Sequence, residues 1–312
     1  MTDLSQAALP RFKTEAGRAR YLAAYDAVLK AWPVAYQDLD VPTRLGLTHV
    51  IASGAPESPP LIQLPSFAGS ATVWRLNVEG LSRHFRVYAV DVIGQPGKSQ
   101  AIRRLRNRRD YAGWYTDLLD GLGVDRASIV GCSFGGFLAL SQAMLTPERV
   151  DRMVLISPAG SFVGLSWAFT YAMRVRAPVL RLVRRLTRSK RSPSLADLST
   201  RQARRLPADR LWSALIAVTM AEAPKVSIIN AAVFTRAELA SVRAPTLLLI
   251  GDRETLYQPQ ATLDLARARM PALDTALVTD ADHIAAMAQP EDVNRRIVAF
   301  LRPGAEGSGV AR

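Results

Sequence analysis

A glycine–x–serine–x–glycine pattern at residues 131–135 is the part of the chain best suited to chemistry. The pattern is typical of a nucleophile elbow, a sharp strand-to-helix turn that exposes the central side chain and needs glycines for room. Residues 127–130 predict the strand and residues 134–146 the helix, whose N-terminus would direct unpaired N–H groups at an oxyanion. The pattern therefore predicts Ser133 as a nucleophile. The alternative is a glycine-rich turn with an ordinary serine.

A general base for Ser133 must come from few candidates, because the chain has three histidines. Histidine is the usual base near neutral pH, since its unperturbed pKa is about 6.5. His49 lies in an alternating run that predicts a strand, and His84 ends a predicted helix, where histidine often caps carbonyl groups. His283 lies in a loop between the last predicted strand and the last predicted helix. We expect His283 to be the base.

The carboxylate that would orient His283 has two candidates. Residues 244–250 form a nearly continuous apolar run bounded by proline and glycine, which is typical of a strand buried on both faces of a parallel sheet. Asp252 and Glu254 follow at its carboxyl end, where loops carry function in such sheets. The aspartates beside His283 in the chain are less suited, since a near neighbour normally points elsewhere. Spacing alone leaves Asp252 and Glu254 open.

Over residues 61–301 the chain resembles the α/β-hydrolases and is similar to bacterial carboxylesterases of that superfamily. Residues 88–99 resemble the loop after the fourth strand, and residues 147–158 resemble the run into the strand after the elbow helix. The resemblance implies an α/β fold with a mostly parallel central sheet, helices on both faces and a helical cap insertion. It also implies the order serine, acid, histidine, with the acid three residues after a strand-ending glycine. That position is Glu254, and Asp252 becomes the runner-up.

The loop after the third strand departs from the family pattern. Pro65 and Ser66 stand where the family usually has histidine and glycine. The resemblance implies that the backbone N–H groups of Phe67 and Phe134 form the oxyanion hole. Both donors are main-chain groups, so the substitution need not remove them, although it replaces residues that shape the loop. For the Ser66 hydroxyl, a loop-stabilising hydrogen bond is favoured over a role as an added donor.

Length and composition agree with one large domain and an insertion. The chain has 312 residues, of which 49% are hydrophobic, enough to bury a full core. Strands and helices alternate from residue 61 onward. Before them come a predicted helix over 13–30 and two predicted strands within 34–51, which are expected to begin the sheet as a hairpin-like edge. Helical sequence replaces this rhythm after residue 158, including predicted helices over 165–188 and 206–226. The predicted division is a core of 1–158 and 244–302, a helical cap of 159–243 and a flexible tail of 303–312.

Cellular location and redox chemistry are also constrained. No apolar run approaches the roughly 18 residues that span a bilayer. The N-terminus has neither a basic start nor an apolar signal core, so a cytoplasmic protein is expected. Cys132 is the only cysteine and excludes an intrachain disulfide. Although it precedes Ser133, the elbow exposes the central residue, and we predict that Cys132 is a buried spacer.

The formal net charge of +13 arises mostly from two arginine-rich segments, 171–205 and 103–109. In the first segment, arginines alternate with aliphatic residues, so one interpretation is a cationic amphipathic helix that touches anionic lipid or acidic substrates. A solvated face of the cap is the favoured interpretation. No recognised nucleic-acid motif accompanies the charge, and we expect no nucleic-acid partner.

The function predicted from these residues is cleavage of small carboxylic esters through an acyl-enzyme on a Ser133, His283 and Glu254 triad. No metal or organic cofactor is implied. Lactone hydrolysis and carbon–carbon bond hydrolysis stay open on the same machinery, because fold and triad do not determine the substrate. A different class of function is a small-molecule sensor with slow or no turnover.

Overall fold

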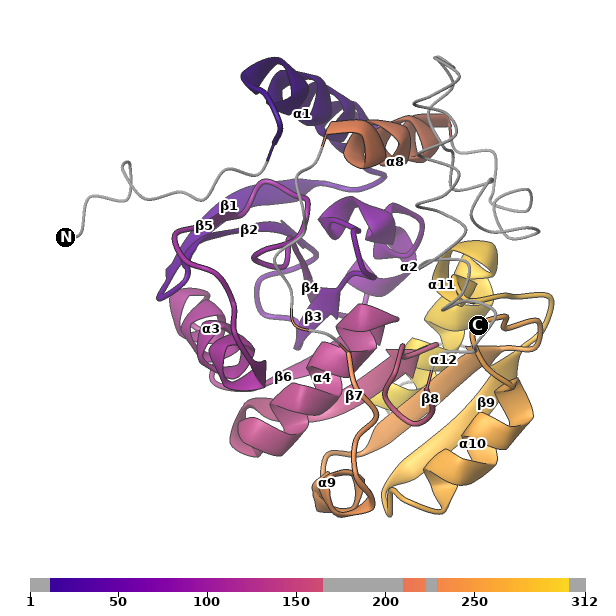
Figure 1. The fold of residues 1–312 in the computed structure, drawn as a ribbon. Coiled ribbons are helices and arrows are strands. Elements are labelled where there is room, and N and C mark those ends of the chain that lie inside the picture. Colours follow the sequence, from indigo (N-terminus) through magenta and orange to yellow (C-terminus); the bar gives the residue numbers. More distant parts are fainter. Residues whose placement is uncertain (1–11, 165–209, 223–228, 230, 303–312) are drawn as a thin grey trace, which may run out of the picture.

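The computed structural model describes residues 12–164, 210–222, 229 and 231–302. Within these residues a nine-stranded sheet forms the centre of the molecule (Figure 1). The strands are β1 (Tyr36–Thr43), β2 (Gly46–Ser53), β3 (Pro60–Leu64), β4 (Arg86–Val90), β5 (Gln100–Ala101), β6 (Ala127–Cys132), β7 (Val150–Ile156), β8 (Thr246–Gly251) and β9 (Leu273–Val278).

Helices connect these strands and flank the sheet. The α-helices are α1 (Glu15–Lys30), α2 (Val78–Ser82), α3 (Arg108–Gly121), α4 (Phe134–Leu145), α8 (Arg210–Glu222), α9 (Arg236–Ser241), α10 (Pro259–Arg267), α11 (Ala285–Ala288) and α12 (Pro290–Leu301). Two short 3₁₀ helices are η1 (Ala71–Leu76) and η2 (Pro147–Arg149).

The order of the strands places a topological switch point at the centre of the sheet. The order is β1-β2-β4-β3-β6-β7-β8-β9, with β5 beside β2, and all neighbours from β4 to β9 are parallel. β1 and β2 form an antiparallel hairpin at the edge, as the sequence predicts for residues 34–51. After β3 the chain goes to β4 on one side and returns to β6 on the other. Ligands bind at such switch points in open α/β sheets, at the carboxyl ends of the strands.

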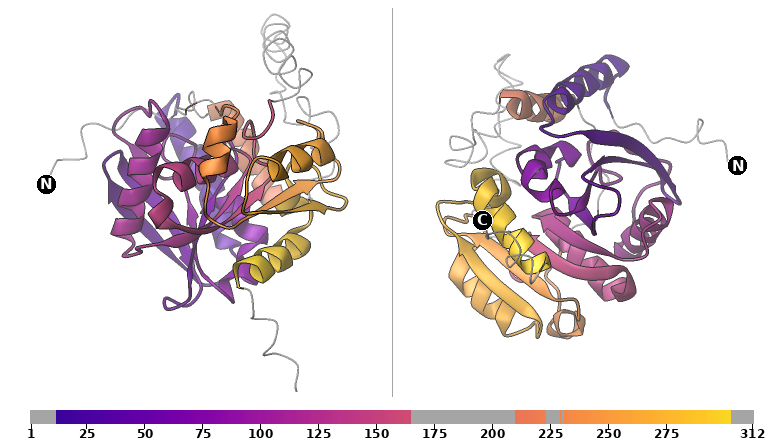
Figure 2. Two further views of the ribbon diagram at one scale, coloured as in Figure 1. Left: turned by 90° about the horizontal axis from the view of Figure 1, so that it is seen from below. Right: turned by 180° about the vertical axis from the view of Figure 1, so that it is seen from behind.

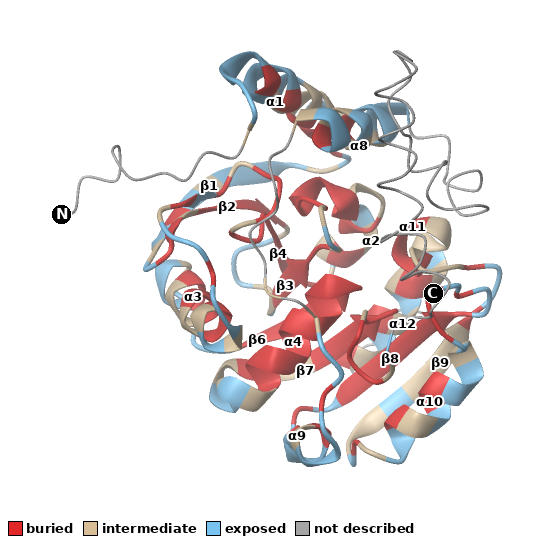
Figure 3. Ribbon diagram, viewed as in Figure 1, coloured by how far each residue is buried: buried red, intermediate tan, exposed pale blue. Residues whose placement is uncertain are grey.

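Helices cover both faces of the sheet, as predicted, so the central strands are buried throughout (Figure 3). One core lies between the sheet and α3, α4 and α10, with Trp114, Phe137 and Leu263 as members. The other lies between the sheet and α1, α2 and α12, with Tyr21, Leu81 and Ile297 as members. A strand buried on both faces gains from apolar side chains at every position, which explains the continuous apolar run before Gly251.

The predicted cap is described only in part. The predicted helix over 165–188, the arginine-rich segment 171–205 and the tail 303–312 lie outside the described residues. The predicted helix over 206–226 contains α8, which lies beside α1 (Figures 1 and 2). An ion pair of 2.6 Å between Arg20 and Glu222 joins these two helices. Among the described residues, none of the helices combines the length and apolar character that crossing a membrane requires.

The packing of α4 leads to a first prediction about stability. Leu138 is fully buried between α4 and the sheet, whereas Leu145, at the end of the same helix, is 38% exposed. Leu138→Ala should lower the free energy of unfolding by about 2 to 5 kcal/mol, because the cavity left in a close-packed core closes only in part. Leu145→Ala, the matched control, should cost less than about 1 kcal/mol. Denaturant unfolding measures both, and equal losses would contradict the assigned packing.

Candidate active site

Ser133 lies at the turn between β6 and α4 in a strained backbone conformation. Its φ of 52° and ψ of −111° are rare for a residue with a side chain. The turn is tight enough to require both flanking glycines. A Cβ atom on Gly131 would lie 2.4 Å from the carbonyl oxygen of Gly135, and one on Gly135 would lie 2.2 Å from that of Leu64. These contacts confirm the elbow geometry that the sequence pattern predicts.

A continuous line of hydrogen bonds joins Ser133, His283 and Glu254. The Nε2 atom of His283 lies 2.8 Å from Oγ of Ser133, and its Nδ1 atom lies 2.8 Å from Oε2 of Glu254. An ionised carboxylate only accepts hydrogen bonds, so the proton of a neutral imidazole resides on Nδ1. Nε2 then carries a lone pair directed at the serine hydroxyl. This arrangement can remove a proton from Ser133.

The sheet topology explains why these distant residues meet. Ser133 follows β6, Glu254 follows β8, and His283 follows β9, and the carboxyl ends of these parallel strands lie at one edge of the sheet. β8 and β9 are neighbours up to the pair Gly251 and Val278, where both strands end. The loops that carry the acid and the histidine therefore leave the sheet side by side. This register places Glu254 within hydrogen-bond distance of His283.

The environment of Glu254 keeps its carboxylate ionised. The residue is 8% exposed. Its Oε1 atom accepts hydrogen bonds from the backbone N–H groups of Thr255, at 2.8 Å, and Leu256, at 2.9 Å. Burial would raise the pKa of Glu254, but the charge of His283 and these hydrogen bonds outweigh burial and lower the pKa. A buried anion next to Nδ1 stabilises the imidazolium that forms when His283 takes a proton.

Asp252, the alternative acid, lies elsewhere in the same loop. Its side chain is exposed, and its Oδ1 atom accepts a hydrogen bond of 3.3 Å from the backbone of Ala281. Asp280 forms an ion pair with Arg253. Asp282 accepts a hydrogen bond from the backbone of Ile284. Of the acids considered from the sequence, the structure brings Glu254 to His283 and gives the others local roles.

The two predicted oxyanion donors lie on adjacent segments. Leu64 at the end of β3 pairs with Gly131 of β6, so the loop of residues 65–70 leaves the sheet beside the elbow. Phe134 is the first residue of α4, where no carbonyl of the helix accepts its N–H. Phe67 lies in a tight turn closed by a 3.0 Å hydrogen bond from the backbone N–H of Gly69 to the carbonyl of Ser66. Their role, and that of the Ser66 hydroxyl, stay predictions.

Cys132 confirms the prediction of a buried spacer. It is 4% exposed and contributes to the core on the α1 side of the sheet. Burial and, to a lesser degree, the charge of Glu254 raise the pKa of its thiol to about 12. A thiol is a nucleophile only as the thiolate. Burial and the raised pKa therefore both disfavour Cys132 as a nucleophile.

The other two histidines have different environments. His84 follows α2, and its carbonyl accepts a 3.4 Å hydrogen bond from Arg302. His49 lies on a strand, β2, as predicted, but its contacts with two carboxylates, including that of Asp91, were not predicted. The alternating pattern around His49 predicts a strand and gives no sign of this pairing. The useful signal was Asp91, which lies in the segment 88–99 that resembles the family's loop after the fourth strand.

A metal-binding group or a pocket near Ser133, His283 and Glu254 would extend the candidate site. Within the described ranges, no group of three or more His, Cys, Asp or Glu side chains could hold a metal ion. A pocket of about 470 Å³ is lined by residues at the N-terminus of α3, by Phe137 of α4, by Phe234 and by Glu238 of α9, among others. None of the triad residues lines this pocket.

A model of the α/β hydrolase fold family matches residues 59–290. That match covers well over half of the chain, and together with the sheet and the elbow it shows that the protein belongs to this family. The resemblance inferred from the sequence is thereby confirmed.

Individual relatives agree with this assignment. Carboxylesterase YbfK of Bacillus subtilis strain 168 is 33% identical over 296 residues, which cover 91% of this chain and 94% of that protein. A protein named uncharacterized carboxylesterase nap, from the same organism, is 32% identical over 287 residues, 90% of this chain and 92% of its own. The crystal structure of naproxen esterase (carboxylesterase NP) from Bacillus subtilis matches with a TM-score of 0.80 and 31% identity, covering 91% of this chain and 98% of its own.

The burial of Cys132 leads to a second prediction. In the folded protein, a disulfide reagent should modify this thiol at about pH 8 at least a thousandfold more slowly than in denaturing guanidinium chloride, since both access and thiolate fraction are low. The measurement is unambiguous because the chain has one cysteine. Equal rates in the two conditions would contradict the burial of Cys132.

Proposed function

We propose that this protein is a carboxylic ester hydrolase that works through an acyl-enzyme on Ser133. The observation that carries the proposal is the line of two 2.8 Å hydrogen bonds from Ser133 through His283 to Glu254. A second support is the strained elbow, which holds the serine Oγ at the N-terminus of α4. A third is that relatives similar to nearly the whole chain are named carboxylesterases.

In the proposed reaction, Oγ of Ser133 attacks the ester carbonyl carbon while its proton passes to Nε2 of His283. The backbone N–H groups of Phe67 and Phe134 stabilise the tetrahedral oxyanion, and removal of such a donor in comparable sites costs about 3 kcal/mol. The intermediate collapses as His283 protonates the departing alkoxide, which leaves as the alcohol. A water molecule, deprotonated by His283, then attacks the acyl-enzyme, releases the carboxylic acid and restores the serine.

Glu254 is proposed to serve both halves of this cycle. Its lowered pKa means that it stays an anion at neutral pH, so it holds the Nδ1–H tautomer of His283 in the resting enzyme. When the imidazole becomes positively charged, the same carboxylate is its buried counter-charge. Both functions need a charge, so an amide of the same shape cannot replace Glu254.

The proposed substrate class is a small-molecule ester. Lactone or carbon–carbon bond hydrolysis uses the same machinery, and fold and triad do not separate them. A slow-turnover sensor is the other alternative, and the complete hydrogen-bonded line is the argument against it, because a binder has no need of an oriented base. We further propose the division of the chain into a core of 1–158 and 244–302 and a cap of 159–243. The cytoplasmic location stays a prediction.

The third prediction tests the nucleophile. Ser133→Ala should abolish labelling by a fluorophosphonate probe and lower kcat for a p-nitrophenyl ester by roughly 10⁴-fold or more, since the group that forms the acyl-enzyme is gone. The wild-type enzyme should complete many turnovers, whereas a sensor would stop near one equivalent.

Ser141→Ala is a matched control for this experiment. Ser141 is also a buried serine, and its hydroxyl donates a 2.9 Å hydrogen bond to the carbonyl of Phe137 within α4. This variant should keep both labelling and turnover. Labelling that survives in Ser133→Ala and disappears in Cys132→Ser would overturn the assignment of the nucleophile.

The fourth prediction tests the acid. Glu254→Gln should lower kcat by about 10³- to 10⁴-fold, because the imidazole loses its tautomer lock and its counter-charge. Asp252→Asn, in the same loop, should change kcat by less than about tenfold, since its hydrogen bond to Ala281 supports only the loop backbone. Steady-state kinetics on a soluble ester provides the comparison. If Asp252→Asn is the crippling change, the triad must be reassigned.

A further inference from the structure

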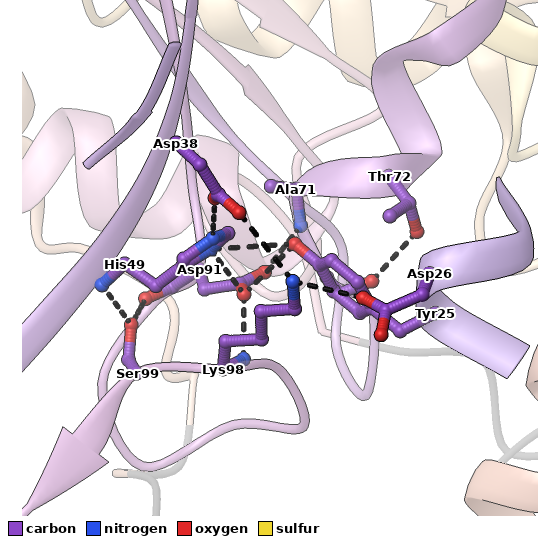
Figure 4. Close-up of polar contacts among 10 residues, drawn as sticks. Tyr25, Asp26, Asp38, His49, Ala71, Thr72, Asp91, Lys98 and Ser99 are labelled. Carbon is purple, nitrogen blue, oxygen red and sulfur yellow. Dashed lines mark hydrogen bonds and ion pairs between the residues drawn. The ribbon is translucent and has the colours of Figure 1, made fainter. Parts of the chain in front are cut away.

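A second buried polar cluster surrounds Asp91, which directly follows β4 (Figure 4). Asp91 is fully buried, yet its carboxylate accepts four hydrogen bonds. Oδ1 accepts from the backbone N–H of Ala71 at 2.7 Å, and Oδ2 accepts from the backbone N–H of Lys98 at 2.7 Å, the hydroxyl of Tyr25 at 3.0 Å and Nδ1 of His49 at 3.0 Å. A buried carboxylate with this many donors is held in one position.

His49 has a carboxylate at each ring nitrogen. Nδ1 contacts Asp91, and Nε2 contacts Oδ1 of Asp38. Ionised carboxylates only accept hydrogen bonds, and a neutral imidazole has a single N–H. Both contacts are therefore satisfied only when His49 is doubly protonated. Burial opposes this charge, but the two carboxylates outweigh burial and raise the pKa of His49.

The other side chains of the cluster come from three segments. α1 supplies Tyr25 and Asp26, β1 supplies Asp38, and the segment after β4 supplies Lys98 (Figure 4). Nζ of Lys98 lies 2.9 Å from Asp26 and 3.5 Å from Asp38. Three carboxylates thus face one lysine and His49. Asp26 and Asp38 reach solvent, with side chains 50% and 45% exposed, whereas Asp91 and His49 are buried. The positive charge of His49 is therefore the one that compensates the buried charge of Asp91.

This cluster is directly connected to the loop that carries Phe67. Ala71, whose N–H is held by Asp91, is the first residue after the loop of residues 65–70. Ala68, the residue after Phe67, donates its N–H to Oε1 of Gln95 at 2.8 Å. Its φ of 58° is unfavourable for alanine, so external contacts must hold the turn. The segment 91–98 supplies both of these contacts.

The close packing around Asp91 explains why residue 97, in the family-like segment 88–99, is a glycine. A Cβ atom on Gly97 would lie 2.5 Å from Cγ of Asp91. Only glycine lets the chain fold over the carboxylate closely enough for the next residue, Lys98, to donate its N–H. The segment 88–99 therefore encloses the Asp91 carboxylate, which in turn holds the backbone N–H of Ala71.

We propose that Asp91 is a positioning residue that holds the loop carrying Phe67 in its oxyanion-binding conformation, and that doubly protonated His49 holds Asp91. This inference rests on the proposed function, because it takes the Phe67 N–H as an oxyanion donor. Deprotonation of His49 removes the donor from one of its two carboxylates and leaves excess negative charge inside the protein. The loop then loses its support as pH rises.

The sign of the pH effect follows from the direction of the pKa shift. The pKa of His49 is raised in the folded protein, so its contribution to stability is complete below about 6.5, the unfolded value, and is lost as pH rises through the folded pKa. The enzyme should therefore lose activity on the alkaline side, as His49 loses its second proton.

Asp91→Asn tests the positioning role. We expect kcat to fall by roughly tenfold to a hundredfold while KM changes by less than about threefold, because a displaced oxyanion donor is felt mainly in the transition state. Binding of a trifluoromethyl ketone, which forms a tetrahedral oxyanion adduct, should weaken by the same factor as kcat/KM. A merely structural role would not couple these two quantities.

Asp117→Asn is the matched control. The Asp117 carboxylate also accepts a backbone N–H, that of Arg44 at 2.7 Å, together with hydrogen bonds from the Arg44 guanidinium, but it lies on α3. The Asp117→Asn variant should leave kcat and inhibitor binding unchanged. If Asp91→Asn matches this control when both are folded, the positioning role is overturned.

Direct observation of His49 tests the proposal without relying on a variant that folds poorly. With three histidines in the chain, ¹⁵N NMR of the imidazoles is readily assigned by His49→Gln. Both nitrogens of His49 should be protonated at neutral pH, and the alkaline loss of kcat in the wild type should disappear in His49→Gln. A neutral single tautomer at neutral pH would overturn the proposal.

The outcome for Ser133→Ala separates this inference from the proposed function. If Ser133→Ala keeps full activity, the proposed function fails whatever Asp91→Asn does. If Ser133→Ala is inactive while Asp91→Asn keeps wild-type kcat and inhibitor affinity, the proposed function stands and the positioning role alone is rejected.

Discussion

The strained backbone of Ser133 is the constraint on which the rest of the site depends. A φ of 52° persists because β6, the start of α4 and the end of β3 pack so closely that Gly131 and Gly135 leave no space for a Cβ atom. That packing fixes the serine hydroxyl at the switch point of the sheet. It also places the loop after β3 beside the first turn of α4, so Ser133 and both proposed oxyanion donors lie at one junction.

Two histidines of the protein, His283 and His49, each contact a buried carboxylate, but the two pairs suit different roles. His283 and His49 each direct Nδ1 at a buried carboxylate, Glu254 in one case and Asp91 in the other. The difference lies at Nε2, which faces the hydroxyl of Ser133 in His283 and a second carboxylate in His49. A hydroxyl partner leaves the nitrogen free to accept a proton, whereas a second carboxylate requires that it already carries one. The first arrangement suits a base and the second a fixed support.

Much of the fold was predictable because its signals are local. The apolar run before Gly251 indicates a strand buried on both faces, and the elbow pattern indicates a strand, a turn and a helix around Ser133. The hairpin at the sheet edge was likewise predicted. The environment of His49 was not, because a strand pattern specifies the face on which a side chain lies and not the residues brought against it by α1 and the loop after β4.

The sequence by itself determined the nucleophile pattern, the short choice of histidines and the two acids Asp252 and Glu254, since residue types and spacing limit what each segment can do. Spacing left the two acids open and the family resemblance favoured Glu254, but only the tertiary structure shows which carboxylate contacts His283. The two lie two positions apart in one loop, and the register of β8 against β9 brings Glu254 within 2.8 Å of His283 while Asp252 stays at the surface. Pairing between segments about 30 residues apart is a property of the packed sheet, which no local pattern encodes.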